Sequence, residues 1–163
     1  MKTVTKQTAI PENSIIANGF DRIDYFDTYR IVRSTGDSAE EIAAQIFELN
    51  LPNRVKWLMY IRDSIVWIFG LKTGREMMRE EQKANFPVIE QNENEIVSGE
   101  NDKHLDFRVS VLIDRENSFI YLTTIVRFNN FWGKMYFLPV RPFHKMIIKS
   151  ILRKYFFNCE KFM

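Results

Sequence analysis

Polar and apolar side chains alternate along residues 104–111, and the polar ones are of types that can do chemistry. Successive side chains of a strand point to opposite faces of a sheet, so the polar ones are expected to share one face: His104, Asp106, Arg108 and Ser110. If that face lines a cavity, His104 and Asp106 form an acid–base pair for catalysis and Arg108 can bind an anion. If the apolar face covers the core instead, the polar face is the solvent-exposed side of a sheet.

Arg62 occupies an unusual place in the hydrophobic pattern. On a helical wheel for residues 53–69, it lies at the centre of the apolar face. A guanidinium there needs a partner, because an unpaired buried charge is strongly destabilising. The partner is either a ligand carboxylate or carbonyl, which makes Arg62 a ligand-binding residue, or an acidic side chain of the protein. Alternatively, the side chain reaches the solvent.

The longest apolar-periodic stretch, residues 131–157, predicts a long helix at the C-terminus. Its apolar side is expected to carry Tyr136, Val140, Phe143, Ile147 and Ile151. Basic residues recur at every fourth position on the opposite side: Arg141, Lys145, Lys149 and Arg153. This basic side is either a solvated outer face or a surface for an anionic membrane or an acidic partner.

Two prolines interrupt that helix pattern. Each proline removes a backbone donor and disfavours helix for the residue before it. We therefore expect a bent first segment over residues 131–138 and a regular helix from about Arg141, with Pro142 in its first turn. The bend at Pro139 would bring Arg141 and His144 near the mouth of a pocket, which makes both candidate ligand-binding residues.

The elements that must position these residues can be read along the chain. Residues 1–20 are a polar lead-in, and the second half of residues 21–32 predicts a strand. Ser38 and Glu41 form a capping box that begins a helix, and a second helix is expected over residues 53–69.

From residue 86 onward the hydrophobic period changes to about two. Two hairpins follow, with turns at residues 92–94 and 115–117. The order predicts an α+β fold in which an antiparallel sheet, with two helices after its first strand, wraps onto the C-terminal helix. The chain is expected to form a single domain, residues 1–163, with its folded part over residues 21–158.

Composition excludes several classes of protein. The chain has 163 residues, 45% of them hydrophobic, and a formal net charge of +2, which does not favour nucleic-acid binding. A single cysteine, Cys159, excludes an internal disulfide framework. The sequence has neither the apolar core of a signal peptide nor a continuous apolar run long enough for a membrane span, so a cytoplasmic protein is expected. It shows no zinc-ligand spacing, phosphate-binding loop or dinucleotide fingerprint, so no metal or cofactor is expected.

Three local signatures carry a resemblance: Gly70-Leu-Lys-Thr73, His104-Leu-Asp-Phe-Arg108 followed by Val109-Ser-Val111, and Val140-Arg-Pro-Phe-His144. They resemble an uncharacterised bacterial family known as a domain of unknown function, over about residues 25–153. The resemblance also implies that some relatives follow a dinucleotide-binding domain, whose glycine fingerprint does not occur in these 163 residues. The element order also resembles the helix-grip (START/SRPBCC) fold of lipid-transfer domains, plant pathogenesis-related allergens and polyketide cyclases. That resemblance implies a ligand cavity between the sheet and the C-terminal helix.

Three functions are consistent with these features. The first is a module that binds a small hydrophobic or amphipathic molecule, with Arg62, Arg108 or Arg141 fixing its polar end. The second is an enzyme similar to cyclases or dehydratases, with His104 and Asp106, or His144, transferring protons. The third is a peripheral membrane or partner-binding domain that uses the basic side of the last helix.

Overall fold

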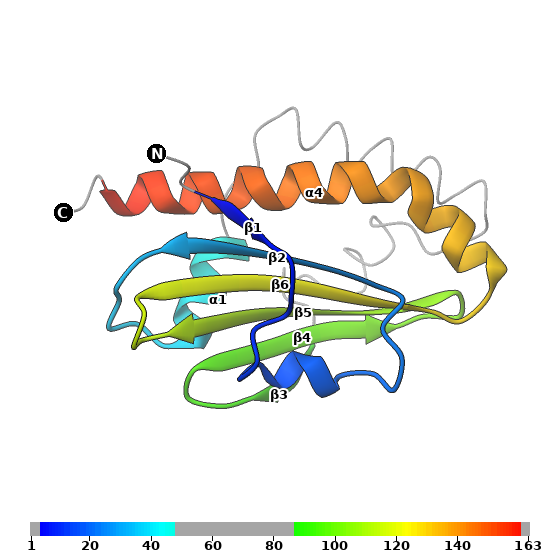
Figure 1. Ribbon diagram of the computed structural model, residues 1–163, viewed down its shortest axis with the longest axis horizontal. Coiled ribbons are helices and arrows are strands. Elements are labelled where there is room, and N and C mark those ends of the chain that lie inside the picture. Colours follow the sequence, from blue (N-terminus) through cyan, green and yellow to red (C-terminus); the bar gives the residue numbers. More distant parts are fainter. Residues whose placement is uncertain (1–3, 48–86, 161–163) are drawn as a thin grey trace.

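The computed structural model describes residues 4–47 and 87–160. Within them, six strands form one antiparallel sheet in the order β1-β2-β6-β5-β4-β3 (Figure 1). The elements are β1 (Thr5–Gln7), η1 (Ile15–Asn18), β2 (Tyr25–Val32), α1 (Ala39–Phe47), β3 (Val88–Gln91), β4 (Glu95–Asn101), β5 (Leu105–Asp114), β6 (Phe119–Phe128) and α4 (Phe131–Glu160). The long α4 packs on the sheet, which confirms the predicted α+β fold with a C-terminal helix.

Both predicted hairpins are present, and side chains fix their turns. In the β3–β4 turn, Asn92 Oδ1 accepts hydrogen bonds from the backbone N–H groups of Asn94 and Glu95, at 2.9 and 2.8 Å. In the β5–β6 turn, Asp114 Oδ1 accepts from the backbone N–H of Asn117 at 3.0 Å. Asn and Asp favour turns because their side chains bond the nearby backbone in this way.

The capping box at the start of α1 is also confirmed. Ser38 Oγ accepts from the Glu41 backbone N–H at 3.2 Å, and Glu41 Oε2 accepts from the Ser38 backbone N–H at 2.8 Å. Ile42 and Ile46 are fully buried, as expected for an apolar stripe. The predicted second helix, residues 53–69, lies outside the described residues, and so does Arg62.

The last helix differs from its prediction in two ways. It is continuous from Phe131 to Glu160 with Pro139 and Pro142 inside it, so residues 131–138 are not a separate segment. Each proline removes one backbone donor, and the effect is a bend in this part of α4 (Figure 1). The buried side is also shifted from the predicted stripe, of which only Ile151 is buried. The buried side carries Phe137, Ile148, Ile151, Leu152 and Tyr155. A wheel drawn through both prolines as one ideal helix places this side incorrectly.

The sheet is covered on both faces. The larger core joins α1 and α4 to the sheet and includes Tyr29, Ile42, Val111 and Leu152. A smaller cluster on the opposite face joins Ile16 of η1 to Val97 and Ile125. The view in Figure 1 has η1 in front of the sheet and α1 behind it.

The polar lead-in therefore contributes to the fold, which the sequence pattern did not predict. β1 pairs with β2 at the edge of the sheet, with Lys6 opposite Tyr29. Ile16 is fully buried. These elements are three and four residues long, too short for a periodic signal. Among the described helices, none is both long and apolar enough to cross a membrane.

Candidate functional site

The polar residues of β5 lie on the face of the sheet opposite α4, and that face is not solvent-exposed. Asp106, Arg108 and Ser110 expose only 2%, 8% and 0% of their surface, because the N-terminal segment covers them. The two interpretations drawn from the sequence both need correction. The polar residues face neither the interior beneath the C-terminal helix nor the solvent.

Asp106 is saturated by protein donors. Its carboxylate accepts from Arg127 Nη2 at 2.6 Å and Nε at 3.2 Å, from Asn129 Nδ2 at 3.0 Å and from the Asp102 backbone N–H at 3.1 Å. Hydrogen bonds to Asp106 and Asp21 hold the pKa of Arg127 above its usual value. A carboxylate bonded in this way holds loops together and has little capacity left for proton transfer.

Arg108 is likewise held by the protein. Its Nη1 donates to the carbonyls of Phe107 at 2.8 Å and Glu100 at 3.3 Å, and its Nη2 donates to Asn101 Oδ1 at 2.8 Å. The guanidinium also lies 4.7 Å from the centre of the Phe20 ring. Burial lowers the pKa of Arg108, the effect expected for a cation removed from water.

His104 supports the beginning of α4. Its Nδ1 lies 3.1 Å from Asn130 Oδ1, which also accepts from the Gly133 backbone N–H at 3.0 Å in the manner of a helix N-cap. Asn129, the neighbour of that cap, binds Asp106. The structure thus gives His104 and Asp106 different partners and does not pair them with each other.

A different set of polar side chains meets beneath α4. Asp27 of β2 exposes 1% of its surface, and its Oδ2 accepts from Tyr25 Oη at 2.7 Å. Its Oδ1 lies 3.5 Å from Nε2 of His144, which reaches it from α4. Thr124 of β6 is directly opposite Asp27 in the sheet. We call the five residues Tyr25, Asp27, Tyr29, Thr124 and His144 the polar cluster.

Within the part of the chain that the structure describes, four buried atoms of the polar cluster have no hydrogen-bond partner: Asp27 Oδ1, Tyr29 Oη, Thr124 Oγ1 and His144 Nε2. A buried polar group without a partner costs about 1–3 kcal/mol, so native proteins keep few of them. Four in one place, between a sheet and a helix, are typical of a site that receives polar groups from another molecule.

The polar cluster is electrostatically unusual. Burial and the neighbouring Asp27 carboxylate raise the pKa of Tyr29 to about 12. Burial also raises the pKa of Tyr25, helped by its hydrogen bond to Asp27. Both phenols therefore stay protonated further into the alkaline range than an ordinary tyrosine, and they can act as hydrogen-bond donors there.

Cations of α4 lie over the polar cluster, and not on the side of the helix that points away from the sheet. The Arg141 guanidinium is 5.1 Å from the centre of the Tyr25 ring, and Lys149 Nζ is 5.8 Å from that of Tyr29. Burial and the charges of Arg141 and Lys6 lower the pKa of Lys145. The basic side predicted to face away from the sheet is therefore turned partly toward its β1–β2 edge.

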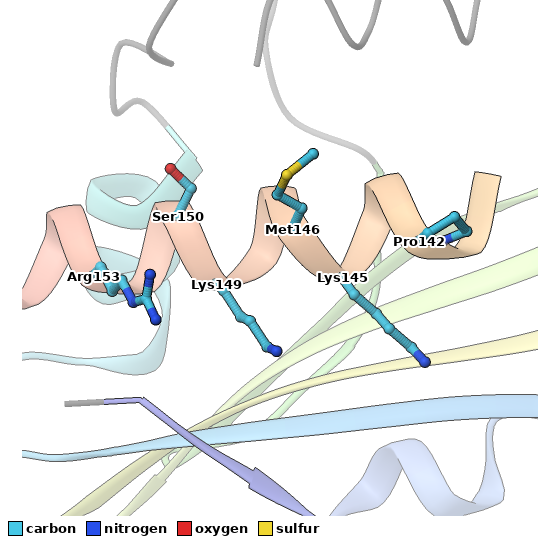
Figure 2. A pocket seen from close by; sticks show the side chains of 6 residues that line it. All are labelled: Pro142, Lys145, Met146, Lys149, Ser150 and Arg153. Carbon is cyan, nitrogen blue, oxygen red and sulfur yellow. The ribbon is translucent and has the colours of Figure 1, made fainter. Parts of the chain in front are cut away.

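A hollow of about 410 Å³ runs along α4, lined by Pro142, Lys145, Met146, Lys149, Ser150 and Arg153. Figure 2 shows Lys145 and Lys149 extending toward the sheet, whereas Met146 and Ser150 extend to the other side of the helix. The hollow follows the flank of α4 and is not the enclosed cavity between sheet and helix that the sequence led us to expect.

Asp27 was missed in the sequence although a signal existed. It alternates in step with Tyr25, Tyr29 and Ile31 along the strand, so it shares their face toward α4. A carboxylate in a half-apolar alternation of this kind is as unusual in a sequence as an arginine at the centre of a predicted apolar helix face. His144, a candidate ligand-binding residue from the sequence, lies in line with the buried Ile148 and faces Asp27.

Comparison with protein families matches residues 20–151 to the model described as "Protein of unknown function (DUF2867)". The matched range begins after η1 and extends into α4. Searches of curated proteins and of solved structures gave no match.

Proposed function

The chain belongs to the DUF2867 family, whose function is unknown, and we propose that it binds a small amphipathic molecule between the sheet and α4. One observation carries this proposal. Among the described residues, the polar cluster presents four buried polar atoms without a hydrogen-bond partner at the place where sheet and helix meet. Two of them, Asp27 Oδ1 and His144 Nε2, face each other at 3.5 Å, and the hydroxyls of Tyr29 and Thr124 are the other two.

The cluster supports a particular kind of ligand. Asp27 Oδ1 accepts hydrogen bonds, so it suits a ligand hydroxyl or amine, whereas the hydroxyls of Tyr29 and Thr124 can donate to a ligand oxygen. The surroundings are apolar, with Val109 opposite Thr124 and Ile148 on α4. A polar end within apolar walls matches a molecule that is itself amphipathic.

The candidate residues from the sequence divide accordingly. His144 and Arg141 remain ligand-binding residues in this proposal, because one contacts Asp27 and the other lies over Tyr25. Arg108 is engaged by protein acceptors on the opposite face. The role of Arg62 stays a prediction.

Two adjacent threonines provide a matched test of the proposal. Thr124→Val removes a hydroxyl of the polar cluster, whereas Thr123→Val removes one on the opposite face, where Thr123 Oγ1 donates to Thr28 Oγ1 at 3.2 Å. We expect native mass spectrometry of gently purified protein to show a bound small molecule. Thr124→Val should lower its occupancy at least about fivefold, since one good hydrogen bond is worth roughly 1 kcal/mol, and Thr123→Val should retain it. Equal occupancy in the two variants, or no bound molecule and no binding of any amphiphile tested, would overturn the proposal.

A second candidate function is acid–base catalysis on the bound molecule, supported by the 3.5 Å contact between His144 and Asp27. An imidazole held beside a carboxylate can take a proton from a ligand carbon and return it. We expect a ligand recovered after incubation with the protein in D₂O to contain deuterium bound to carbon, and the ligand complex of His144→Gln, at saturating ligand, to lack this exchange. Recovery of undeuterated ligand from the wild-type protein would eliminate this candidate.

A further inference from the structure

We propose that the hollow along α4 is an anion subsite, in which Lys145 and Lys149 bind the carboxylate or phosphate head of the ligand. This inference rests on the proposed function, because it assigns the chemical class of the same ligand. It identifies the ligand as an anionic amphiphile.

The charge of the hollow is the first support. Lys145, Lys149 and Arg153 line it from successive turns of α4, and none of the lining residues within the described ranges is acidic. In the part of the chain that the structure describes, the ion pairs involve Arg22, Arg127 and His144, and none involves these three cations. Lys6 of β1 and Arg141 add further positive charge beside Lys145, where they outweigh the opposing charge of the buried Asp27 carboxylate. Such a concentration of like charge favours a bound anion.

The position of these cations is the second support. Lys149 and Arg141 lie over the rings of Tyr29 and Tyr25, and both tyrosines belong to the polar cluster. The cation–ring contacts hold the two side chains at the β1–β2 edge instead of leaving them free in solvent. The anion subsite therefore adjoins the polar cluster at Lys149, and the proposal places one molecule across both.

The remaining lining residues fit an amphiphile better than a bare inorganic ion. Pro142 and Met146 give the hollow apolar walls, and Met146 leaves 47% of its surface exposed. A volume of about 410 Å³ is within the usual range of small-molecule sites. Methionine adapts its shape readily to a flexible apolar chain.

The test compares amphiphiles with the same alkyl chain and different heads. Binding of dodecyl phosphate, dodecanoate and 1-dodecanol is measured by calorimetry below their micelle-forming concentrations, with inorganic phosphate alone as a fourth probe. Vesicles of phosphatidylglycerol and phosphatidylcholine form a separate arm. The variant is Lys145→Gln/Lys149→Gln, and its charge-matched control is Lys103→Gln/Lys134→Gln, which changes two exposed lysines outside the hollow.

We expect the two anionic amphiphiles to bind the wild-type protein at least about tenfold more tightly than 1-dodecanol, the effect of one strong charge-assisted contact. The Lys145→Gln/Lys149→Gln variant should lose this difference and keep its affinity for 1-dodecanol, which also shows that it is folded. Added salt should weaken only the anionic ligands.

Other outcomes overturn the subsite. Equal binding of all three amphiphiles, unchanged in the variant, refutes the anion subsite and leaves the proposed function intact. Binding of none of them refutes both. Binding to phosphatidylglycerol vesicles alone, or equally tight binding of inorganic phosphate, refutes an amphiphile subsite and indicates a lipid surface or a free anion instead.

Discussion

Asp27 and Asp106 are both carboxylates with almost no exposure to solvent, 1% and 2%, but their surroundings differ. Asp106 accepts four hydrogen bonds from protein donors, two of them from Arg127. Among the described residues, Asp27 has one such donor, Tyr25, and a longer contact with His144. A buried charge that the protein satisfies contributes to structure, and one that it leaves partly unsatisfied is a candidate for function.

Arg127→Met should therefore reduce stability substantially. The substitution leaves the Asp106 carboxylate buried without its cation. We expect this to lower the free energy of unfolding by about 2–3 kcal/mol. The loss is smaller than for a fully buried ion pair because the Arg127 side chain is 32% exposed. The control is Arg22→Met, whose side chain is 63% exposed in its pair with Asp24 and should cost under about 1 kcal/mol. Urea denaturation measures both, and similar values for the two variants would contradict this view of Asp106.

Tyr29 should make stability depend on pH in the alkaline range. The folded-state pKa of Tyr29 is about 12, against 10.0 for an unperturbed phenol, so the unfolded chain releases this proton first as pH rises. The stabilising contribution is complete below pH 10 and is lost as pH rises toward 12. The stability of wild-type protein relative to Tyr29→Phe should therefore fall across that range in urea titrations. A difference that is independent of pH would contradict the raised pKa.

At the scale of single elements, patterns local in sequence gave correct predictions. The capping box of α1 and the turns of both hairpins depend on residues within a few positions of one another. Ser38 and Glu41 form reciprocal hydrogen bonds whichever residues pack on α1 later in folding.

Ser38→Ala tests how much that local signal contributes. Loss of an N-cap hydroxyl should lower the free energy of unfolding by about 1 kcal/mol. Ser34→Ala, at an exposed position ahead of the helix, should change it by less than about 0.5 kcal/mol. Chemical denaturation distinguishes these values, and an unaffected Ser38→Ala variant would show that α1 is held by packing alone.

The features that the sequence did not reveal depend on distant contacts. Asp27 and His144 belong to different elements far apart in the chain, and no spacing rule predicts that they meet. The buried side of α4 depends on how two prolines rotate its parts relative to the sheet. Strand alternation correctly divided β5 into two faces, but it could not show that the N-terminal segment covers the polar one.

At the scale of the molecule, the two faces of the sheet have different tasks. The face toward α4 carries the larger core, the polar cluster and the basic side of the helix. The opposite face carries saturated charges, Asp106 with Arg127 and the fully buried Glu95 with Ser14 and Ser110. On one face of the sheet, the buried charges have partners within the protein and support the structure. On the other face, where we place the ligand, buried polar atoms have fewer hydrogen-bond partners among the described residues.

The contact of the N-terminal segment with Glu95 also has a consequence for the order of folding. The hydrogen bond from Ser14 Oγ to Glu95 Oε1 joins residues 81 positions apart. Closing a loop of that length costs about 3 kcal/mol more chain entropy than closing a hairpin of a few residues. We therefore expect the hairpins to form first and the N-terminal segment to dock late.

In the native state this segment should also be the first to detach, by local opening ahead of global unfolding. The amide protons of η1 should then exchange with solvent at a lower free energy than those of β5 and β6, as native-state hydrogen exchange can measure. Equal protection of these amide protons would mean that the N-terminal segment and the sheet open as one unit. Early opening would give water transient access to Asp106 and Glu95, so the charges that look most permanently enclosed would be the first to be rehydrated.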